Sequence, residues 1–311
     1  MTDKEINTQR AMLDIKTPTD YGTMMKYLNI MCDRYKFMSI SYIGESILGR
    51  CIPMVSLGEG KKQIVYIGAH SGKDWLGSAA LIRFINEYCE VKKNGGRIYN
   101  YSIDYLFATR RICVIPMLNP DGVDININGV GDDNILKDRI MSMRQKRDFS
   151  DWEANARGVC LQNNYNGGFL ERRAIAENKG IISGAPWGYG GEAPESEPEI
   201  GALCATMRFS EGLRAALCIG GDRDKIYYRT DKKAPPRGKS IGAALSRMNG
   251  CRLQDEKDGM EYGGFEDFCI EELNIPTFSI PCQVGNGKYP YSYFDVYSKH
   301  REVFFTLPAL V

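Results

Sequence analysis

The chain of 311 residues contains two histidines, His70 and His300. His70 lies four residues before Asp74, in the run His-Ser-Gly-Lys-Asp. An imidazole and a carboxylate, with one coordination position left for water, are what a catalytic zinc ion usually requires. Because catalytic zinc also takes a third protein ligand, the scarcity of histidine predicts that such a site is difficult to build in this chain.

Cysteines supply a second set of candidate residues. One interpretation makes Cys160, Cys218 and Cys282 a thiolate metal site, or makes one of them a nucleophile that works with His70. The other interpretation makes them buried thiols, because cysteine is a small residue that is commonly buried. We favour buried thiols, since none of the ten cysteines forms a CxxC pair.

Loop carboxylates form a third set. Asp74 together with Asp222 or Asp224 offers oxygen ligands for a hard cation. Such side chains are more often solvated or paired with nearby basic residues, here Lys73 and Arg223. The chain has no dense run of oxygen-bearing residues of the kind that binds calcium, so the sequence favours ion pairs at these positions.

The composition is that of an ordinary globular protein, with 43% hydrophobic and 25% charged residues and a net charge of +1. This balance predicts neither nucleic acid nor an anionic membrane as a partner. No apolar run is long enough to cross a membrane, and residues 1–14 lack the apolar core of a signal peptide. Scattered cysteines without an export signal predict a cytoplasmic protein with reduced thiols.

The elements that must position these residues alternate between strands and helices. Apolar runs predict strands at residues 39–43, 50–57, 63–67, 111–118, 214–219 and 277–280. Helical patterns cover residues 21–35, 76–91, 196–208, 240–248, 264–273 and the chain after 290. The alternation predicts an α/β fold in which a twisted mixed sheet is flanked by helices on both faces. We expect one domain over residues 21–311, preceded by an extension at residues 1–20.

Local signals suggest several boundaries. Asp20 can cap the first helix, and Gly250 is placed to end the helix before it. Ser196 and Glu199 have the spacing of a capping box. We expect loops at residues 119–122 and over most of residues 125–193, which are rich in Gly, Asn and charge. In sheets of this kind, sites form beyond the carboxyl ends of the strands, here the segments after residues 67, 118, 219 and 280.

Five motifs lie in a fixed order along the chain: Ile43–Pro53, Pro116–Gly122, Trp152–Leu161, Tyr189–Glu199 and Gly263–Phe268. The second contains Asn-Pro-Asp-Gly, and the third reads Trp-Glu-Ala-Asn-Ala-Arg-Gly-Val-Cys-Leu. This series resembles zinc metallocarboxypeptidases, and in particular the branch of bacterial γ-D-glutamyl-L-diamino acid peptidases. The resemblance runs from about residue 21 to the end of the chain and implies a single carboxypeptidase-like domain.

The zinc ligands of that branch are not found at the matching positions. Its first two ligands lie in a run like GAHHANEW, which here is Gly-Ala-His-Ser-Gly-Lys-Asp-Trp. Alignment without gaps puts Ser71 at the position of the ligand His and Asp74 at that of the Glu, with His70 beside the lost ligand. The third ligand corresponds to Gly220, which has no side chain. The resemblance therefore implies that the metal site is lost and that no zinc cofactor is bound.

The general base is missing as well. The family's Glu in the last strand corresponds to Pro281 or Gln283, and neither side chain can deprotonate a zinc-bound water. By the same resemblance, the residues that would contact substrate are Arg157, Gln162, Asn163 and Tyr262. Arg157 either holds a ligand carboxylate or makes a structural ion pair, and Asn163 either binds ligand or satisfies loop backbone.

The resemblance thus implies a catalytically degenerate member of the branch. Such a pseudoenzyme would bind a peptidoglycan stem-like peptide or a protein partner in the former active-site cleft without hydrolysing it. The alternative is an active metallocarboxypeptidase with a non-standard metal site drawn from His70, Asp74, Asp222 and the cleft cysteines. A third possibility is a structural subunit whose own side chains fill the cleft. A basic side chain at the former metal position, Lys73 or Arg223, would favour an anionic peptide.

Overall fold

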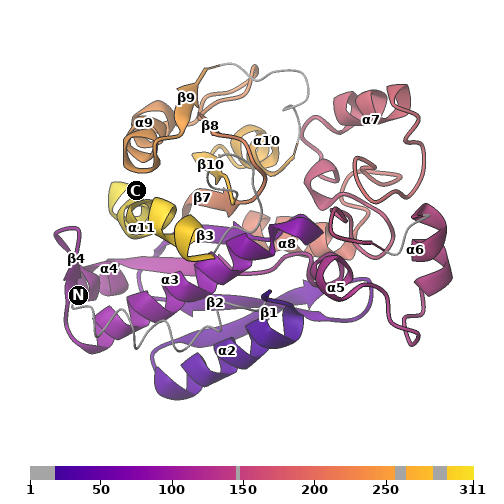
Figure 1. The fold of residues 1–311 in the computed structure, drawn as a ribbon. Coiled ribbons are helices and arrows are strands. Elements are labelled where there is room, and N and C mark those ends of the chain that lie inside the picture. Colours follow the sequence, from indigo (N-terminus) through magenta and orange to yellow (C-terminus); the bar gives the residue numbers. More distant parts are fainter. Residues whose placement is uncertain (1–17, 145–147, 256–263, 283–292) are drawn as a thin grey trace.

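The computed structural model describes residues 18–144, 148–255, 264–282 and 293–311. At its centre is a six-stranded sheet with the order β1-β2-β6-β3-β7-β10 (Figure 1). The strands are β1 (Ser39–Glu45), β2 (Cys51–Leu57), β3 (Lys62–Gly68), β6 (Arg110–Ile115), β7 (Leu213–Ile219) and β10 (Thr277–Ile280). β1, β2 and β6 pair antiparallel, whereas β6, β3, β7 and β10 run parallel. The predicted mixed sheet is confirmed.

Helices cover both faces of this sheet. One face carries α2 (Tyr21–Arg34), α3 (Trp75–Lys93), α9 (Gly238–Asn249) and α11 (Tyr293–Leu310). The other face carries α8 (Pro198–Arg208), α10 (Phe265–Asp267) and the π-helix η3 (Phe268–Glu272). Shorter elements complete the fold: β4 (Arg97–Ile98), β5 (Tyr101–Ser102), β8 (Lys225–Tyr227), β9 (Arg252–Gln254), α4 (Ile103–Thr109), α5 (Pro120–Asn128), α6 (Lys137–Met143), α7 (Phe169–Asn178), and the 3-10 turns η1 (Gly72–Asp74) and η2 (Leu161–Asn163).

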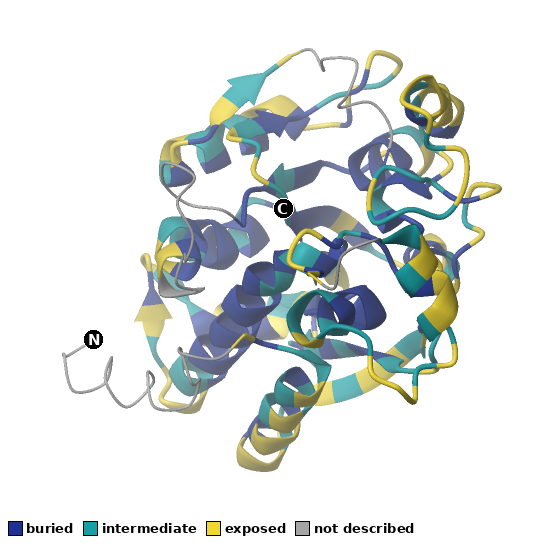
Figure 2. Ribbon diagram, turned by 45° about the vertical axis from the view of Figure 1, so that its right-hand side comes forward, coloured by how far each residue is buried: buried dark blue, intermediate teal, exposed yellow. Residues whose placement is uncertain are grey.

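Strand β3 shows why both faces of the central sheet are apolar. Ile64 and Tyr66 belong to the apolar cluster under α3 and α11, while Val65 and Ile67 belong to the cluster under α8. Successive side chains of a strand point to opposite faces. A strand that is covered on both faces therefore reads as a continuous apolar run. Figure 2 shows the buried residues gathered in this interior.

Two predicted helix ends are confirmed. Asp20 caps α2, because its Oδ1 accepts a hydrogen bond from the Thr23 N–H at 2.8 Å. Gly250 ends α9 in the left-handed conformation, with φ of 75°. Among the described residues, no helix is both long and apolar enough to cross a membrane.

The prediction of loops after β6 was wrong in part. Residues 119–122 begin α5, since Asn119 Oδ1 accepts a hydrogen bond from the Gly122 N–H at 2.9 Å and Pro120 starts the helix. The segment 125–193 also contains α6 and α7. Helix α7 has few buried residues, Phe169 and Ala176, so its sequence lacks the broad apolar stripe that makes a helix easy to recognise.

The predicted capping box was wrong as well. Glu197, not Ser196, occupies the N-cap position of α8, and no side chain there makes a capping hydrogen bond. Ser196 Oγ instead donates to Glu197 Oε1 at 3.0 Å. The Glu199 carboxylate accepts a hydrogen bond from the Ile47 N–H at 3.3 Å, in the connection between β1 and β2. The Glu199 side chain, which the local sequence pattern assigned to a capping box, thus makes a tertiary contact.

Candidate functional site

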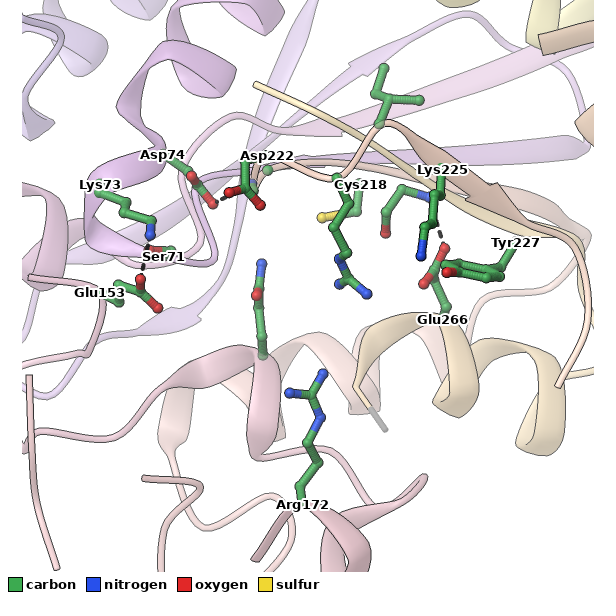
Figure 3. A pocket seen from close by; sticks show the side chains of 16 residues that line it. Ser71, Lys73, Asp74, Glu153, Arg172, Cys218, Asp222, Lys225, Tyr227 and Glu266 are labelled. Carbon is green, nitrogen blue, oxygen red and sulfur yellow. Dashed lines mark hydrogen bonds and ion pairs between the residues drawn. The ribbon is translucent and has the colours of Figure 1, made fainter. Parts of the chain in front are cut away.

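A cavity of about 360 Å³ lies at the carboxyl ends of the parallel strands (Figure 3). Ser71 and Asp74 come from the turn after β3, Gly220 follows β7, and Ile280 ends β10. Two of the four segments predicted to form a site, those after residues 67 and 219, therefore meet here, together with the end of β10 itself. Among the described residues, the segments that follow residues 118 and 280 directly contribute no lining residue.

The turn after β3 is held in place by close packing. A side chain on Gly72 would begin 2.4 Å from the Gly122 carbonyl oxygen, so only glycine allows the turn to lie against the start of α5. The Gly72 N–H donates to the Glu153 carbonyl at 3.0 Å. Helix α3 begins directly after this turn, and each of its residues from Leu76 to Cys89 is buried. Ser71 and Asp74 are therefore carried by a rigid part of the core.

Ser71 and Asp74 are both buried beside the cavity. Ser71 is 3% exposed, and its Oγ has no hydrogen-bond partner among the described residues. Asp74 is fully buried; its Oδ2 accepts from the Gly221 N–H at 3.0 Å, and the Cys282 thiol donates to its Oδ1 at 3.1 Å. Burial raises the pKa of Asp74 to about 6. The carboxylate takes up space next to Gly220, since a Cβ there would lie 2.7 Å from Asp74 Oδ2.

Charged side chains of both signs surround the same space. The basic lining residues are Lys73, Arg172, Arg223 and Lys225, and the acidic ones are Asp74, Glu153, Asp222 and Glu266. Lys73 Nζ is bonded to the Glu153 carboxylate and does not bond to Asp74. The formal charge of the lining is therefore balanced.

The comparisons with known proteins agree with this geometry. The family described as zinc carboxypeptidase matches residues 24–294. The chain belongs to this family. Over 277 residues it is 28% identical to gamma-D-glutamyl-L-diamino acid endopeptidase 1 of Lysinibacillus sphaericus, covering 89% of this chain and 68% of that protein. The family that the motifs indicated is confirmed.

Solved structures confirm the fold. Bovine thrombin-activatable fibrinolysis inhibitor, in complex with tick carboxypeptidase inhibitor, matches with a TM-score of 0.69 at 15% identity, over 95% of this chain and 97% of that one. Murein-tripeptide amidase MpaA from Escherichia coli O157 matches with a TM-score of 0.51 at 18% identity, over 87% and 91% of the two chains. At these identities the likeness shows the carboxypeptidase fold alone.

The residues of this zinc carboxypeptidase homologue do not fit a catalytic zinc ion. Ser71, Asp74 and Gly220, which the resemblance matched to the zinc ligands, line one cavity, but Gly220 has no side chain and both oxygens of Asp74 already accept hydrogen bonds. Within the described parts of the chain, no group of three His, Cys, Asp or Glu side chains is arranged to hold a metal ion. The three protein ligands that catalytic zinc requires are not supplied by these positions.

His70 does not line the cavity. Its ring is fully buried, with Nε2 2.7 Å from the Tyr165 hydroxyl and Nδ1 3.3 Å from Cys218 Sγ. Burial lowers the pKa of His70 to about 3, so the ring is neutral at physiological pH. The other histidine, His300, is buried with its Nε2 2.8 Å from the Pro281 carbonyl oxygen.

Of the three cysteines that the sequence singled out, Cys218 and Cys282 lie near Asp74. Cys218 lines the cavity, Cys282 donates to Asp74, and Cys160 is buried away from the lining. Burial raises the pKa of each thiol above its ordinary range. A thiol in such surroundings stays protonated and is a poor nucleophile.

Of the predicted substrate contacts, Gln162 lies in the cavity wall. Asn163 donates through Nδ2 to the Gly188 carbonyl at 3.0 Å, and Arg157 Nη1 lies 3.8 Å from Glu197 Oε1. Neither Asn163 nor Arg157 lines the cavity, so a role in ligand binding stays a prediction for both. Tyr262 and Gln283 lie outside the described residues.

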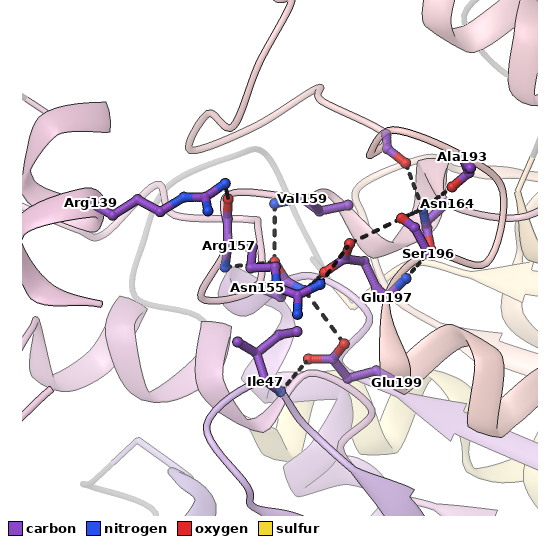
Figure 4. Close-up of polar contacts among 11 residues, drawn as sticks. Ile47, Arg139, Asn155, Arg157, Val159, Asn164, Ala193, Ser196, Glu197 and Glu199 are labelled. Carbon is purple, nitrogen blue, oxygen red and sulfur yellow. Dashed lines mark hydrogen bonds and ion pairs between the residues drawn. The ribbon is translucent and has the colours of Figure 1, made fainter. Parts of the chain in front are cut away.

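A polar network holds the motif loops together (Figure 4). Asn155 Nδ2 donates to Glu197 Oε2 at 2.7 Å and to Glu199 Oε2 at 3.4 Å. Asn155 Oδ1 accepts from the N–H groups of Arg157 and Val159 at 3.0 and 3.1 Å. Sequence reasoning missed Asn155, although it lies in one quoted motif and its two carboxylate partners lie in another.

The buried carboxyl groups of this network are stabilised by hydrogen-bond donors. Burial raises the pKa of Glu199 to about 8, and the nearby charges of Asp121 and Glu197 act in the same direction. Asp121, in the Asn-Pro-Asp-Gly motif, accepts from the Leu48 N–H at 2.9 Å and from Arg50 Nη1 at 2.6 Å. The motif thereby ties the start of α5 to the connection between β1 and β2.

Proposed function

We propose that this protein is a catalytically inactive zinc carboxypeptidase homologue that binds a peptide in the former active-site cavity without hydrolysing it. The observation that carries the proposal is the set of groups around that cavity: Ser71 offers a hydroxyl, Asp74 an already bonded carboxylate, and Gly220 no side chain. Lewis-acid activation of water by zinc needs three protein ligands and an open position. The chain keeps the fold that forms the cavity, but these three positions do not supply three zinc ligands.

Two observations support a small charged peptide as the ligand. A cavity of about 360 Å³ lies within the roughly 300–1,000 Å³ of small-molecule sites, which favours an open cleft over one filled by its own side chains. The relative from Lysinibacillus sphaericus is named for γ-D-glutamyl-L-diamino acid peptides. A peptidoglycan stem-like peptide of this class is therefore the proposed ligand, with a protein partner as the second candidate. No nucleic-acid or membrane partner is proposed, and cytoplasmic location stays a prediction.

The competing function is peptide hydrolysis with a non-standard metal site. It would need His70, Asp74, Asp222 or the cleft cysteines to turn toward one ion. The contacts of His70 with Tyr165 and Cys218 favour the inactive alternative, because the ring would have to leave the core to reach a metal.

Metal content and hydrolysis test the inactive state together. Purified protein is equilibrated with zinc, dialysed, and analysed for bound metal, and is then incubated with γ-D-glutamyl-diaminopimelate peptide. We expect far less than one zinc ion per chain and no cleavage. About one tightly bound zinc per chain, lost in Asp74→Ala and accompanied by cleavage, would overturn the proposal.

A restored variant serves as the positive control. The triple change Ser71→His, Asp74→Glu and Gly220→His replaces all three positions with the ligand types that the family resemblance implies. It is expected to retain about one zinc ion per chain, because the three backbone positions already face one cavity. Binding of the peptide to the unmodified protein, followed by calorimetry, tests the second half of the proposal.

A further inference from the structure

The polar groups around Gly220 form an incomplete site. Asp74 is a fully buried carboxylate for which no ion pair is found among the described residues. The Ser71 hydroxyl beside it is also buried and lacks a partner in the same part of the chain. An ionised carboxylate buried without a counter-ion, and a buried hydroxyl without a hydrogen bond, are both costly. Lys73 acts on Asp74 only through its charge, because its ammonium bonds to Glu153.

We propose that a primary ammonium group of the ligand occupies the former metal position, held by the Asp74 carboxylate and the Ser71 hydroxyl. This inference rests on the proposed function, since it concerns a peptide that stays uncleaved in the cavity.

Hydrogen-bonding capacity favours an ammonium over a metal ion. An ammonium has three donors and no acceptor. An ionised carboxylate has about four acceptor sites, of which the Gly221 N–H and the Cys282 thiol use two on Asp74. Ser71 Oγ adds a third acceptor to the two sites that remain on Asp74. One positive charge with three donors therefore matches what these residues offer.

The rest of the cavity indicates that the ligand is a zwitterion. Basic and acidic lining residues are equal in number, so a ligand with only an ammonium would leave an uncompensated charge in the cavity. A carboxylate on the same ligand restores the balance. Arg172 (Figure 3) and Arg223 line the same cavity. Guanidinium groups are suited to carboxylates even when they also have other partners. The ligand class is thus an amino-acid head group with a free amino group and a carboxylate.

Two peptides that differ only in the ammonium test this assignment. Calorimetry compares γ-D-glutamyl-diaminopimelate with an analogue in which each free amino group is replaced by hydrogen, so that no bulk is added. Loss of a charge-assisted hydrogen bond in a buried site predicts that the analogue binds at least about tenfold more weakly.

Three variants locate the ammonium. Ser71→Ala removes a hydroxyl that has no partner in the described protein, so the fold is expected to persist. Asp74→Asn removes the negative charge at nearly constant shape. Both are expected to weaken binding of the amino peptide several-fold or more, and to leave binding of the deaminated analogue unchanged. Asp224→Asn is the matched control: Asp224 lies in the segment between β7 and β8, outside the lining, and its change should alter neither affinity.

The outcomes separate this inference from the proposed function. Equal affinity for the two peptides overturns the ammonium assignment and leaves an inactive peptide-binding protein. Failure of both peptides to bind overturns the assignment and the proposed ligand, while metal content and hydrolysis still decide whether the protein is inactive. Equal loss of both affinities in Ser71→Ala and Asp74→Asn would also overturn the assignment, because it would indicate a general structural effect.

Discussion

The network around Asn155 and the cavity around Asp74 both carry residues of family motifs, yet their polar atoms are used differently. In the network, the amide of Asn155 bonds to two buried carboxylates and to two backbone N–H groups. In the cavity, the Ser71 hydroxyl has no partner and Asp74 has no ion pair among the described residues. The network motifs hold loops in place. Sequence similarity over these motifs therefore indicates the carboxypeptidase fold and does not indicate catalytic activity.

Removing Asn155 should have the largest effect on stability. Asn155→Ala leaves two backbone donors and two buried carboxylates without their shared partner, and is expected to lower the free energy of unfolding by at least about 3 kcal/mol. Asn163→Ala, which removes one bond to a loop carbonyl, should cost about 1 kcal/mol. Urea unfolding followed by tryptophan fluorescence measures both. Equal losses would show that the Asn155 network contributes no more to stability than a single loop hydrogen bond.

The two regions should also titrate in different pH ranges. Burial raises the pKa of Glu199 from 4.5 to about 8 and that of Asp74 from 3.8 to about 6. A pKa raised by folding means that the folded state binds the proton more tightly, so each group's contribution to stability is lost as pH rises from its unfolded pKa to its folded pKa.

Isosteric variants isolate these contributions. Relative to the unmodified protein, Glu199→Gln should gain stability as pH rises up to about 8, and Asp74→Asn should gain it only up to about 6. Each gain is expected to reach roughly 2 kcal/mol or more, at about 1.4 kcal/mol per pKa unit. Melting temperatures between pH 4 and 9 provide the difference curves. A flat curve for either variant would show that its carboxyl titrates normally.

A side chain at Gly220 should disturb Asp74. The Cβ of Gly220→Ala would lie 2.7 Å from Asp74 Oδ2, so the variant is expected to be about 1–3 kcal/mol less stable. Combining it with Asp74→Ala should remove most of this additional cost. Gly201→Ala in α8 is the control, because its Cβ would have no neighbour nearer than 3.7 Å and alanine favours a helix. A Gly220→Ala protein as stable as Gly201→Ala contradicts the crowding.

The smallest effect is expected at Ser71. Ser71→Ala removes a buried hydroxyl without a partner, and should leave stability unchanged or raise it by up to about 1 kcal/mol. Ser46→Ala, in contrast, removes a hydrogen bond to Asp121 Oδ1 of 2.9 Å and should cost about 1 kcal/mol. Thermal unfolding of the two variants side by side distinguishes them. A clear loss in Ser71→Ala would mean that the hydroxyl is bonded within the free protein.

Much of the fold could be predicted because the sheet is covered on both faces. Strands β3, β6 and β7 are then continuous apolar runs with sharp ends. The local assignments failed where a side chain bonds across the fold: Glu199 reaches Ile47, whereas the Ser196 N–H bonds to the Ala193 carbonyl. Helix α7 was missed because few of its residues are buried and its sequence shows little amphipathic pattern.

The sequence by itself determined which chemical groups are available at each family position: Gly220 can never be a ligand, whatever the fold. Only the tertiary structure decided where the remaining groups point. His70 turns toward Tyr165 and Cys218, Lys73 bonds to Glu153, and Asp74 lies against Gly220. The reason is physical: a missing side chain is a covalent fact, whereas the direction of a side chain depends on packing between β3, β7 and β10, which are far apart in the chain.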